Sequence, residues 1–101
     1  MIKVSGFQVA PAEIEGALLS HPAVADCAVF GAPHDVKGQV PHAAVVRRTS
    51  VEVDEAELIE WSGEQLANYK RLVGVEFVDE VPRTASGKAL RRVLLERFSA
   101  R

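Results

Sequence analysis

Apolar and polar residues alternate along much of this chain in the way that β-strands require. Residues 2–9, IKVSGFQV, alternate on both sides of a Ser-Gly pair, which predicts a short hairpin or a bent strand. Apolar runs at residues 24–31, 40–48 and 75–79 predict three further strands. The polar residues 32–39 contain several turn formers and are predicted to be a loop.

Three other stretches have the spacing of amphipathic helices. The first begins at Pro11, where the amide hydrogen that proline lacks would be unpaired in any case, and it ends before Pro22. The second begins at Asp54, which resembles a capping box with Glu57 three residues later. The third runs from about residue 89 to residue 98. This order predicts a small α+β domain, in which helices cover a sheet of roughly three strands and an N-terminal β-hairpin is added.

Composition and charge narrow the class of protein. The chain has 101 residues, enough for one domain, and its 48% of hydrophobic and 26% of charged residues are typical of globular proteins. A net charge of −2 argues against a nucleic-acid-binding module, which usually has a basic face. No segment approaches the continuous apolar length of a membrane helix. The first residues already have a strand pattern, so we expect the chain to be cut from a longer protein.

Cysteine and histidine provide no pattern typical of a metal site. Cys27 is the only cysteine of the sequence, which favours a reducing compartment, by default the cytoplasm. Its place in an apolar run indicates a core residue. His21, His34 and His42 lack metal-ligand spacing, and we interpret them as structural or loop residues.

The segment PRTASGKALRR, residues 82–92, places a single lysine, Lys88, between a run of small residues and the last helix. The segment does not match a phosphate-binding P-loop, because Pro82 and Ala89 stand where that motif needs a glycine and a serine or threonine. Two interpretations of Lys88 stay open on the residues themselves. It is either a compact charge for an oxygen that becomes negative in a transition state, or a solvated lysine at a helix N-terminus.

Residues 2–15 and 77–92 strongly resemble two signature stretches of the adenylate-forming superfamily. This superfamily contains acyl-CoA synthetases, aryl-CoA ligases, firefly luciferases and the adenylation domains of peptide synthetases. The resemblance extends over nearly the full chain, including HPAVADCAVFGAPHDVKGQVPHAAVV between the two stretches. Residues 1–101 thus resemble the small C-terminal domain of such an enzyme, with the N-terminal domain absent.

The resemblance implies a two-step reaction. A carboxylate attacks the α-phosphate of ATP, and a thiol, usually of coenzyme A, then displaces AMP. ATP, Mg²⁺ and the acid would be bound mainly by the missing domain, so the isolated domain would be inactive and hold no metal. Lys88 on its Gly87 loop would serve adenylation, and the hairpin with Lys3 and Gly6 would serve the second step. Ser5 and Phe7 of the same hairpin are further candidates for substrate or cofactor binding.

The stretch NYKRLVGVEFVDEVPRTASGK is similar to the 4-coumarate–CoA ligase and luciferase-like branch, including Leu72 where many relatives have proline. We therefore favour an acid–CoA ligase, with fatty acid metabolism as a setting. The alternative of a peptide-synthetase adenylation domain fits less well, because such domains end closer to Asn-Gly-Lys-Val-Asp-Arg. A free-standing interaction or regulatory module with this fold is a third possibility. This domain does not identify the carboxylic acid substrate, because the resemblance assigns the acid pocket to the missing domain.

The remaining basic residues allow two interpretations each. Lys70 and Arg71 could meet coenzyme A phosphates or form an ordinary basic helix end. Arg91 and Arg92 could steady the lysine loop or the nucleotide, or lie on a solvated helix face. The resemblance further implies that a lysine acetyltransferase could silence the enzyme at Lys88, since acylation removes the charge.

Overall fold

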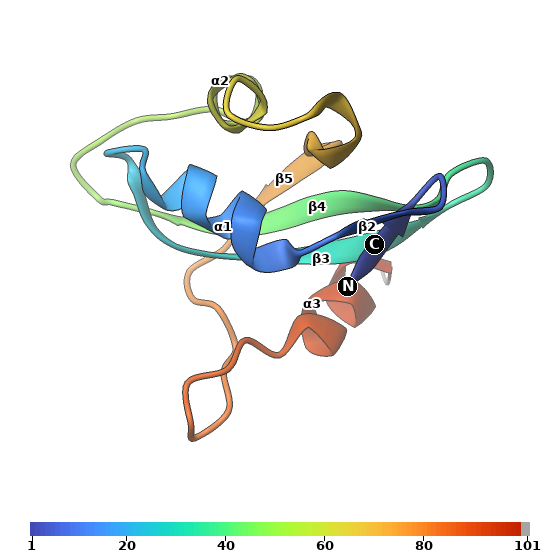
Figure 1. The fold of residues 1–101 in the computed structure, drawn as a ribbon. Helices are drawn as coiled ribbons and strands as arrows, with labels where there is room; N and C mark the ends of the chain where they lie inside the picture. The colour runs from blue at the N-terminus through green and yellow to red at the C-terminus, as the bar shows by residue number, and fades with distance from the viewer. Residues whose placement is uncertain (100–101) are drawn as a thin grey trace.

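The structure is a computed structural model that describes residues 1–99, and it consists of a five-stranded sheet with helices on both faces (Figure 1). The elements in chain order are β1 (Ile2–Val4), β2 (Phe7–Val9), α1 (Pro11–Leu19), β3 (Val24–His34), β4 (Gly38–Arg47), α2 (Glu55–Gly63), the short 3₁₀ helix η1 (Asn68–Lys70), β5 (Gly74–Phe77) and α3 (Arg91–Ser99). The predicted α+β class is confirmed.

Strand β4 lies at the centre of the sheet and pairs with three other strands. One of its edges pairs with β3 along nearly the whole strand, and its other edge pairs with β1 at Gly38 and with β5 from His42 to Val45. β5 runs parallel to β4, and α2 lies in the connection between them. The sheet has five strands, because the predicted hairpin β1–β2 pairs with β4 and so joins the three predicted strands β3, β4 and β5.

The prediction of a loop over residues 32–39 was wrong. β3 continues to His34 and β4 starts at Gly38, so the turn between them is three residues long. Pro33 pairs with Gln39 in this extension. A proline is tolerated there because β3 is an edge strand, where the missing amide hydrogen breaks no pairing.

The alternation along β3 and β4 divides the buried side chains into two clusters. Cys27, Val29 and Val45 point to the face covered by α1 and α2, together with Leu18 and Leu58 of those helices. The residues between them point to the other face, where α3 packs. The second cluster comprises Ala28, Phe30, Ala32, Val40, Ala44, Val81 and Leu94. Figure 1 shows α3 beneath the sheet and α1 and α2 on the opposite side. Burial on both faces makes the sheet a rigid frame for the segments attached to its ends.

Glutamates from the helices bind backbone amides on two of the outer strands of the sheet, β3 and β5. Oε2 of Glu15 accepts the amide of Val29 on β3 at 2.8 Å, and Oε2 of Glu55 accepts the amide of Val75 on β5 at 2.8 Å. Arg91 then donates through Nε to the Val29 carbonyl at 2.8 Å and pairs with Glu15. These bonds satisfy backbone groups that an open edge would leave free for another chain. They also attach the start of α3 to β3.

His42 occupies a tight position on the α3 side of the sheet. Its ring centroid lies 4.6 Å from that of Phe98 and 6.0 Å from that of Phe30. Its Nδ1 is buried and has no hydrogen-bond partner among residues 1–99. Burial lowers the pKa of His42 below its usual 6.5, against the opposing charges of Glu76 and Glu55.

Acid is therefore expected to destabilise the domain through His42. The unfolded chain binds a proton at this histidine more readily than the folded chain, so the free energy of unfolding falls as pH drops below about 6.5. Above that pH, His42 is neutral in both states and its burial no longer lowers the free energy of unfolding. Urea unfolding between pH 5.5 and 7.5 should show this slope, and His42→Leu should flatten it. An equal slope in both proteins would contradict the assignment.

Candidate functional site

Lys88 is exposed and lies on a small hydrogen-bonded loop between β5 and α3. The Thr84 amide donates to the Lys88 carbonyl at 2.8 Å, and the Gly87 amide donates to the Thr84 carbonyl at 2.9 Å. The Thr84 hydroxyl accepts the Lys88 amide at 3.1 Å. Gly87 has φ +90°, a conformation that residues with a Cβ rarely adopt. The loop expected from its small residues is thus a defined turn that projects from the domain (Figure 1).

Lys3, Ser5, Gly6 and Phe7 lie together on the β1–β2 hairpin. Ser5 and Gly6 both have positive φ, 50° and 87°, as the tightest hairpin turns require. A Cβ built on Gly6 would meet no atom within 4 Å, so open space surrounds the backbone there. Lys3 is exposed on β1 opposite Gln8. The hairpin thus presents an exposed backbone turn beside an exposed cationic side chain.

Contacts with distant residues hold this hairpin in place. The Ser5 amide donates to the Lys37 carbonyl at 2.8 Å, and the Lys3 amide donates to Oε1 of Gln39 at 2.8 Å. The ring of Phe7, 56% exposed, stacks on Tyr69 of η1 with centroids 4.6 Å apart. Sequence reasoning missed the role of Tyr69, because the contact joins segments that are far apart in the chain.

Lys70 and Arg71 differ in their surroundings. Nζ of Lys70 lies 2.8 and 2.9 Å from the carboxylate oxygens of Glu13, and this hydrogen bond raises the pKa of Lys70 above its usual value. Arg71 is exposed, and its guanidinium lies over Gly63, where a Cβ would meet it at 2.6 Å. The structure thus places Lys70 in an ion pair beside the hairpin and leaves Arg71 near the end of α2.

The Lys88 loop and the hairpin lie at opposite ends of β3. Arg83, at the base of the loop, binds Asp26 near the start of β3, whereas the hairpin turn binds Lys37 just after its end at His34. Eight residues separate Asp26 from His34, which corresponds to roughly 25 Å of strand. In Figure 1 the loop projects at the lower left and the hairpin turn lies at the right. The candidate residues therefore form two sites.

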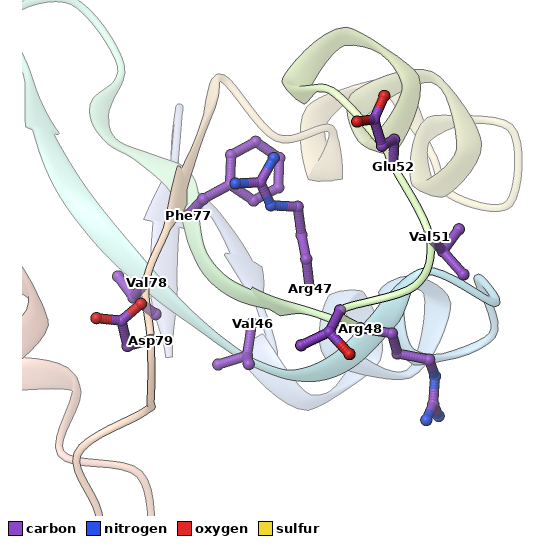
Figure 2. Close-up of a pocket in the computed structure, with 9 residues that line it drawn as sticks. Val46, Arg47, Arg48, Val51, Glu52, Phe77, Val78 and Asp79 are labelled. Carbon is purple, nitrogen blue, oxygen red and sulfur yellow. The ribbon is translucent and has the colours of Figure 1, made fainter.

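A hollow on the surface lies apart from both candidate sites. It has a volume of about 500 Å³ and lies between the end of β4, the residues that follow it and the end of β5. Figure 2 shows the Arg47 guanidinium against the ring of Phe77, at 4.2 Å from its centroid. Arg48, Glu52 and Asp79 bring charges of both signs, so the hollow favours no particular ionic ligand. None of the candidate residues lines it.

Other groups are structural. Nε2 of His21 lies 2.7 Å from Oε2 of Glu57, and its Nδ1 accepts the Ala23 amide at 3.0 Å. Burial raises the pKa of the Cys27 thiol to about 12, with smaller contributions from Glu15 and Asp26.

Among the described residues, no three His, Cys, Asp or Glu side chains lie together as metal ligands. Within the same residues, no helix is long and apolar enough to cross a membrane.

The chain is similar over its full length to known proteins. A family model for the AMP-binding enzyme C-terminal domain matches residues 13–88. A 4-coumarate–CoA ligase-like protein of Oryza sativa subsp. japonica is 50% identical over 101 residues, which cover 100% of this chain and 18% of that protein. ATP-bound MatB from Rhodopseudomonas palustris has a TM-score of 0.90 at 37% identity, over 97% of this chain and 20% of MatB.

A third relative was solved with a reaction intermediate. The o-succinylbenzoate CoA synthetase of Bacillus subtilis, in complex with its acyl-adenylate, has a TM-score of 0.86 at 43% identity, over 92% of this chain and 19% of that enzyme. The chain thus spans about a fifth of the length of these relatives. The resemblance drawn from residues 2–15 and 77–92 is confirmed, and the chain belongs to the AMP-binding enzyme C-terminal domain family.

Proposed function

We propose that this chain is the mobile C-terminal domain of an ATP-dependent, AMP-forming acid–CoA ligase. Lys88 serves the adenylation step, and the hairpin of residues 2–9 serves thioester formation. The observation that carries the proposal is the placement of these two exposed segments at opposite ends of one rigid sheet. Because roughly 25 Å of strand separates their anchors, one active site can receive only one of them at a time. This separation supports a rotation of the whole domain between the two steps.

Lys88 suits the first step. When a carboxylate oxygen attacks the α-phosphate of ATP, pyrophosphate leaves and negative charge is redistributed over the phosphoryl oxygens. A compact ammonium on a flexible stem can bind such an oxygen, and its fixed position lowers the barrier. The exposure of Lys88 supports this role, since its partners would belong to the N-terminal domain. Neither Lys88 nor the hairpin of residues 2–9 supplies a carboxylate, the side chain through which proteins usually bind Mg²⁺, so we assign the metal to that domain.

The hairpin suits the second step. The thiol of coenzyme A attacks the acyl carbonyl of the adenylate, and AMP leaves with the electron pair of the broken bond. The open space around Gly6 allows its backbone to approach the adenylate or the pantetheine arm closely. Lys3, Ser5 and Phe7 lie beside it as further contacts. Arg71 is a better candidate than Lys70 for a coenzyme A phosphate, because Lys70 is already paired with Glu13.

Two finer assignments belong to this proposal. A reducing cytoplasm suits the buried free thiol of Cys27. Acetylation of Lys88 by a lysine acetyltransferase would remove the charge that adenylation needs, and an exposed lysine on a projecting loop is accessible to such an enzyme.

Pyrophosphate exchange tests whether adenylation needs the N-terminal domain as well as this one. The 101-residue chain is expected to be silent when it is incubated with ATP, Mg²⁺, labelled pyrophosphate and a panel of aryl and acyl acids, because one domain forms no closed cleft. The full-length protein that carries it should transfer label into ATP in the presence of one class of acid. Acid-dependent exchange by the 101-residue chain would contradict the proposal. A full-length protein that is silent with every acid would favour an interaction module.

A further inference from the structure

One guanidinium joins the Lys88 loop to the sheet. Nη1 of Arg83 donates to the carbonyl of Gly87, the residue before Lys88, at 2.9 Å. Nη2 of the same side chain lies 2.7 Å from Oδ1 of Asp26 near the start of β3. Arg83 therefore holds the backbone next to the lysine and a fixed point of the sheet at the same time.

The other bonds of the loop determine its shape but not its direction. Arg83 and Ala89 form a bridge at its base, and the Thr84 hydroxyl accepts the Lys88 amide. Considering residues 1–99, the hydrogen bonds of residues 84–88 run within the loop or to Arg83. A closed turn on a narrow base could still tilt as a unit. The bond from Arg83 to Asp26 restrains that tilt.

The chemistry of the pair favours orientation over stability. A guanidinium presents its N–H groups in a rigid planar fork, so it can bind a carbonyl and a carboxylate together, which a lysine cannot do with the same geometry. Both side chains are more than a third exposed, 36% for Arg83 and 38% for Asp26. Exposed ion pairs contribute little to the stability of a fold. The main consequence of the contact is thus the direction of the loop.

We propose that Arg83 is a positioning residue for Lys88, with Asp26 as its anchor on β3. This inference rests on the proposed function of Lys88 in adenylation. Reacting groups must be held in place, and a misplacement of about 1 Å can cost roughly a hundredfold in rate. Arg83 provides that placement without touching the substrate.

Loop order in the 101-residue chain tests the geometry without any enzyme assay. Arg83→Gln removes the fork, and Arg48→Gln is the matched control, because Arg48 is also an exposed arginine but makes neither of the two contacts of Arg83. NMR order parameters at Gly87 and Lys88 should fall from about 0.85 to below about 0.6 in Arg83→Gln. Asp26→Asn should lower them less, and Arg48→Gln should leave them unchanged. Unchanged values in Arg83→Gln would overturn the proposal.

Kinetics of the full-length ligase test the role. Arg83→Gln should slow adenylation roughly tenfold and spare thioester formation from a supplied acyl-adenylate, with an unchanged thermal melt. In a Lys88→Ala background it should cause no further loss, since it acts through that lysine. Full adenylation by Arg83→Gln beside a crippled Lys88→Ala would overturn this inference only. Full adenylation by Lys88→Ala would overturn the proposed function, and the inference with it.

Discussion

Replacing Lys88 with alanine in the full-length ligase is expected to slow adenylation about a hundred- to a thousandfold. The loss of one preorganised electrostatic contact to a transition state typically costs about 2.7–4 kcal/mol. Because the Lys88 loop and the hairpin lie at opposite ends of β3, the second step should be spared. Pyrophosphate exchange measures the first step, and release of AMP from a supplied acyl-adenylate and coenzyme A measures the second.

Arg48→Ala is the control for this variant. It removes an exposed positive charge from the same domain, so any effect of the domain's net charge should be the same in both variants. Arg48→Ala should leave both steps intact. Equal losses in the two steps for Lys88→Ala, with an unchanged melt, would show that the lysine does not belong to adenylation.

Local patterns predicted the elements of the fold better than their pairing. Pro11 begins α1, and Asp54 caps α2 by accepting the Glu57 amide at 2.8 Å, as their local sequences indicate. The joining of β1 to β4 at Gly38 could not be predicted, because it depends on contacts between distant residues. The extension of β3 through Pro33 was missed for a similar reason. A segment with several turn formers is normally predicted to be a loop. A proline such as Pro33 is compatible with a strand only at the edge of a sheet, and the sequence does not show that β3 lies at an edge.

The candidate sites show the same difference between local motifs, which the sequence reveals, and contacts between distant residues, which it does not. Lys88, Gly87 and the hairpin were proposed as candidates from their motifs, which are continuous in the sequence. The residues that hold those segments in place were not found. Tyr69 stacks on Phe7, which lies 62 positions earlier in the sequence (69 − 7). Asp26 binds Arg83, which lies 57 positions later. Single side chains that meet only in the fold leave no periodic or spaced signal in a sequence.

A bulky residue at Gly6 is expected to affect the opposite step from Lys88→Ala. Gly6→Val in the full-length ligase should leave adenylation intact and slow thioester formation roughly a hundredfold, so that the acyl-adenylate accumulates. Within this domain a Cβ at Gly6 meets no atom within 4 Å, and the obstruction would therefore arise against the adenylate or the pantetheine arm. The same two partial reactions measure this effect.

Backbone strain is the competing explanation, because Gly6 has φ +87° and a valine there costs on the order of 1–3 kcal/mol. Gly6→Asn separates the two causes, since asparagine tolerates positive φ far better than valine but still carries a side chain. If close approach matters, both variants slow the second step while a thermal melt of Gly6→Asn stays near that of the wild type. If only strain matters, Gly6→Asn is nearly normal, and Gly6→Val melts earlier and weakens both steps together. That second outcome would reduce Gly6 to a turn residue and remove the hairpin backbone from the proposed thioester site.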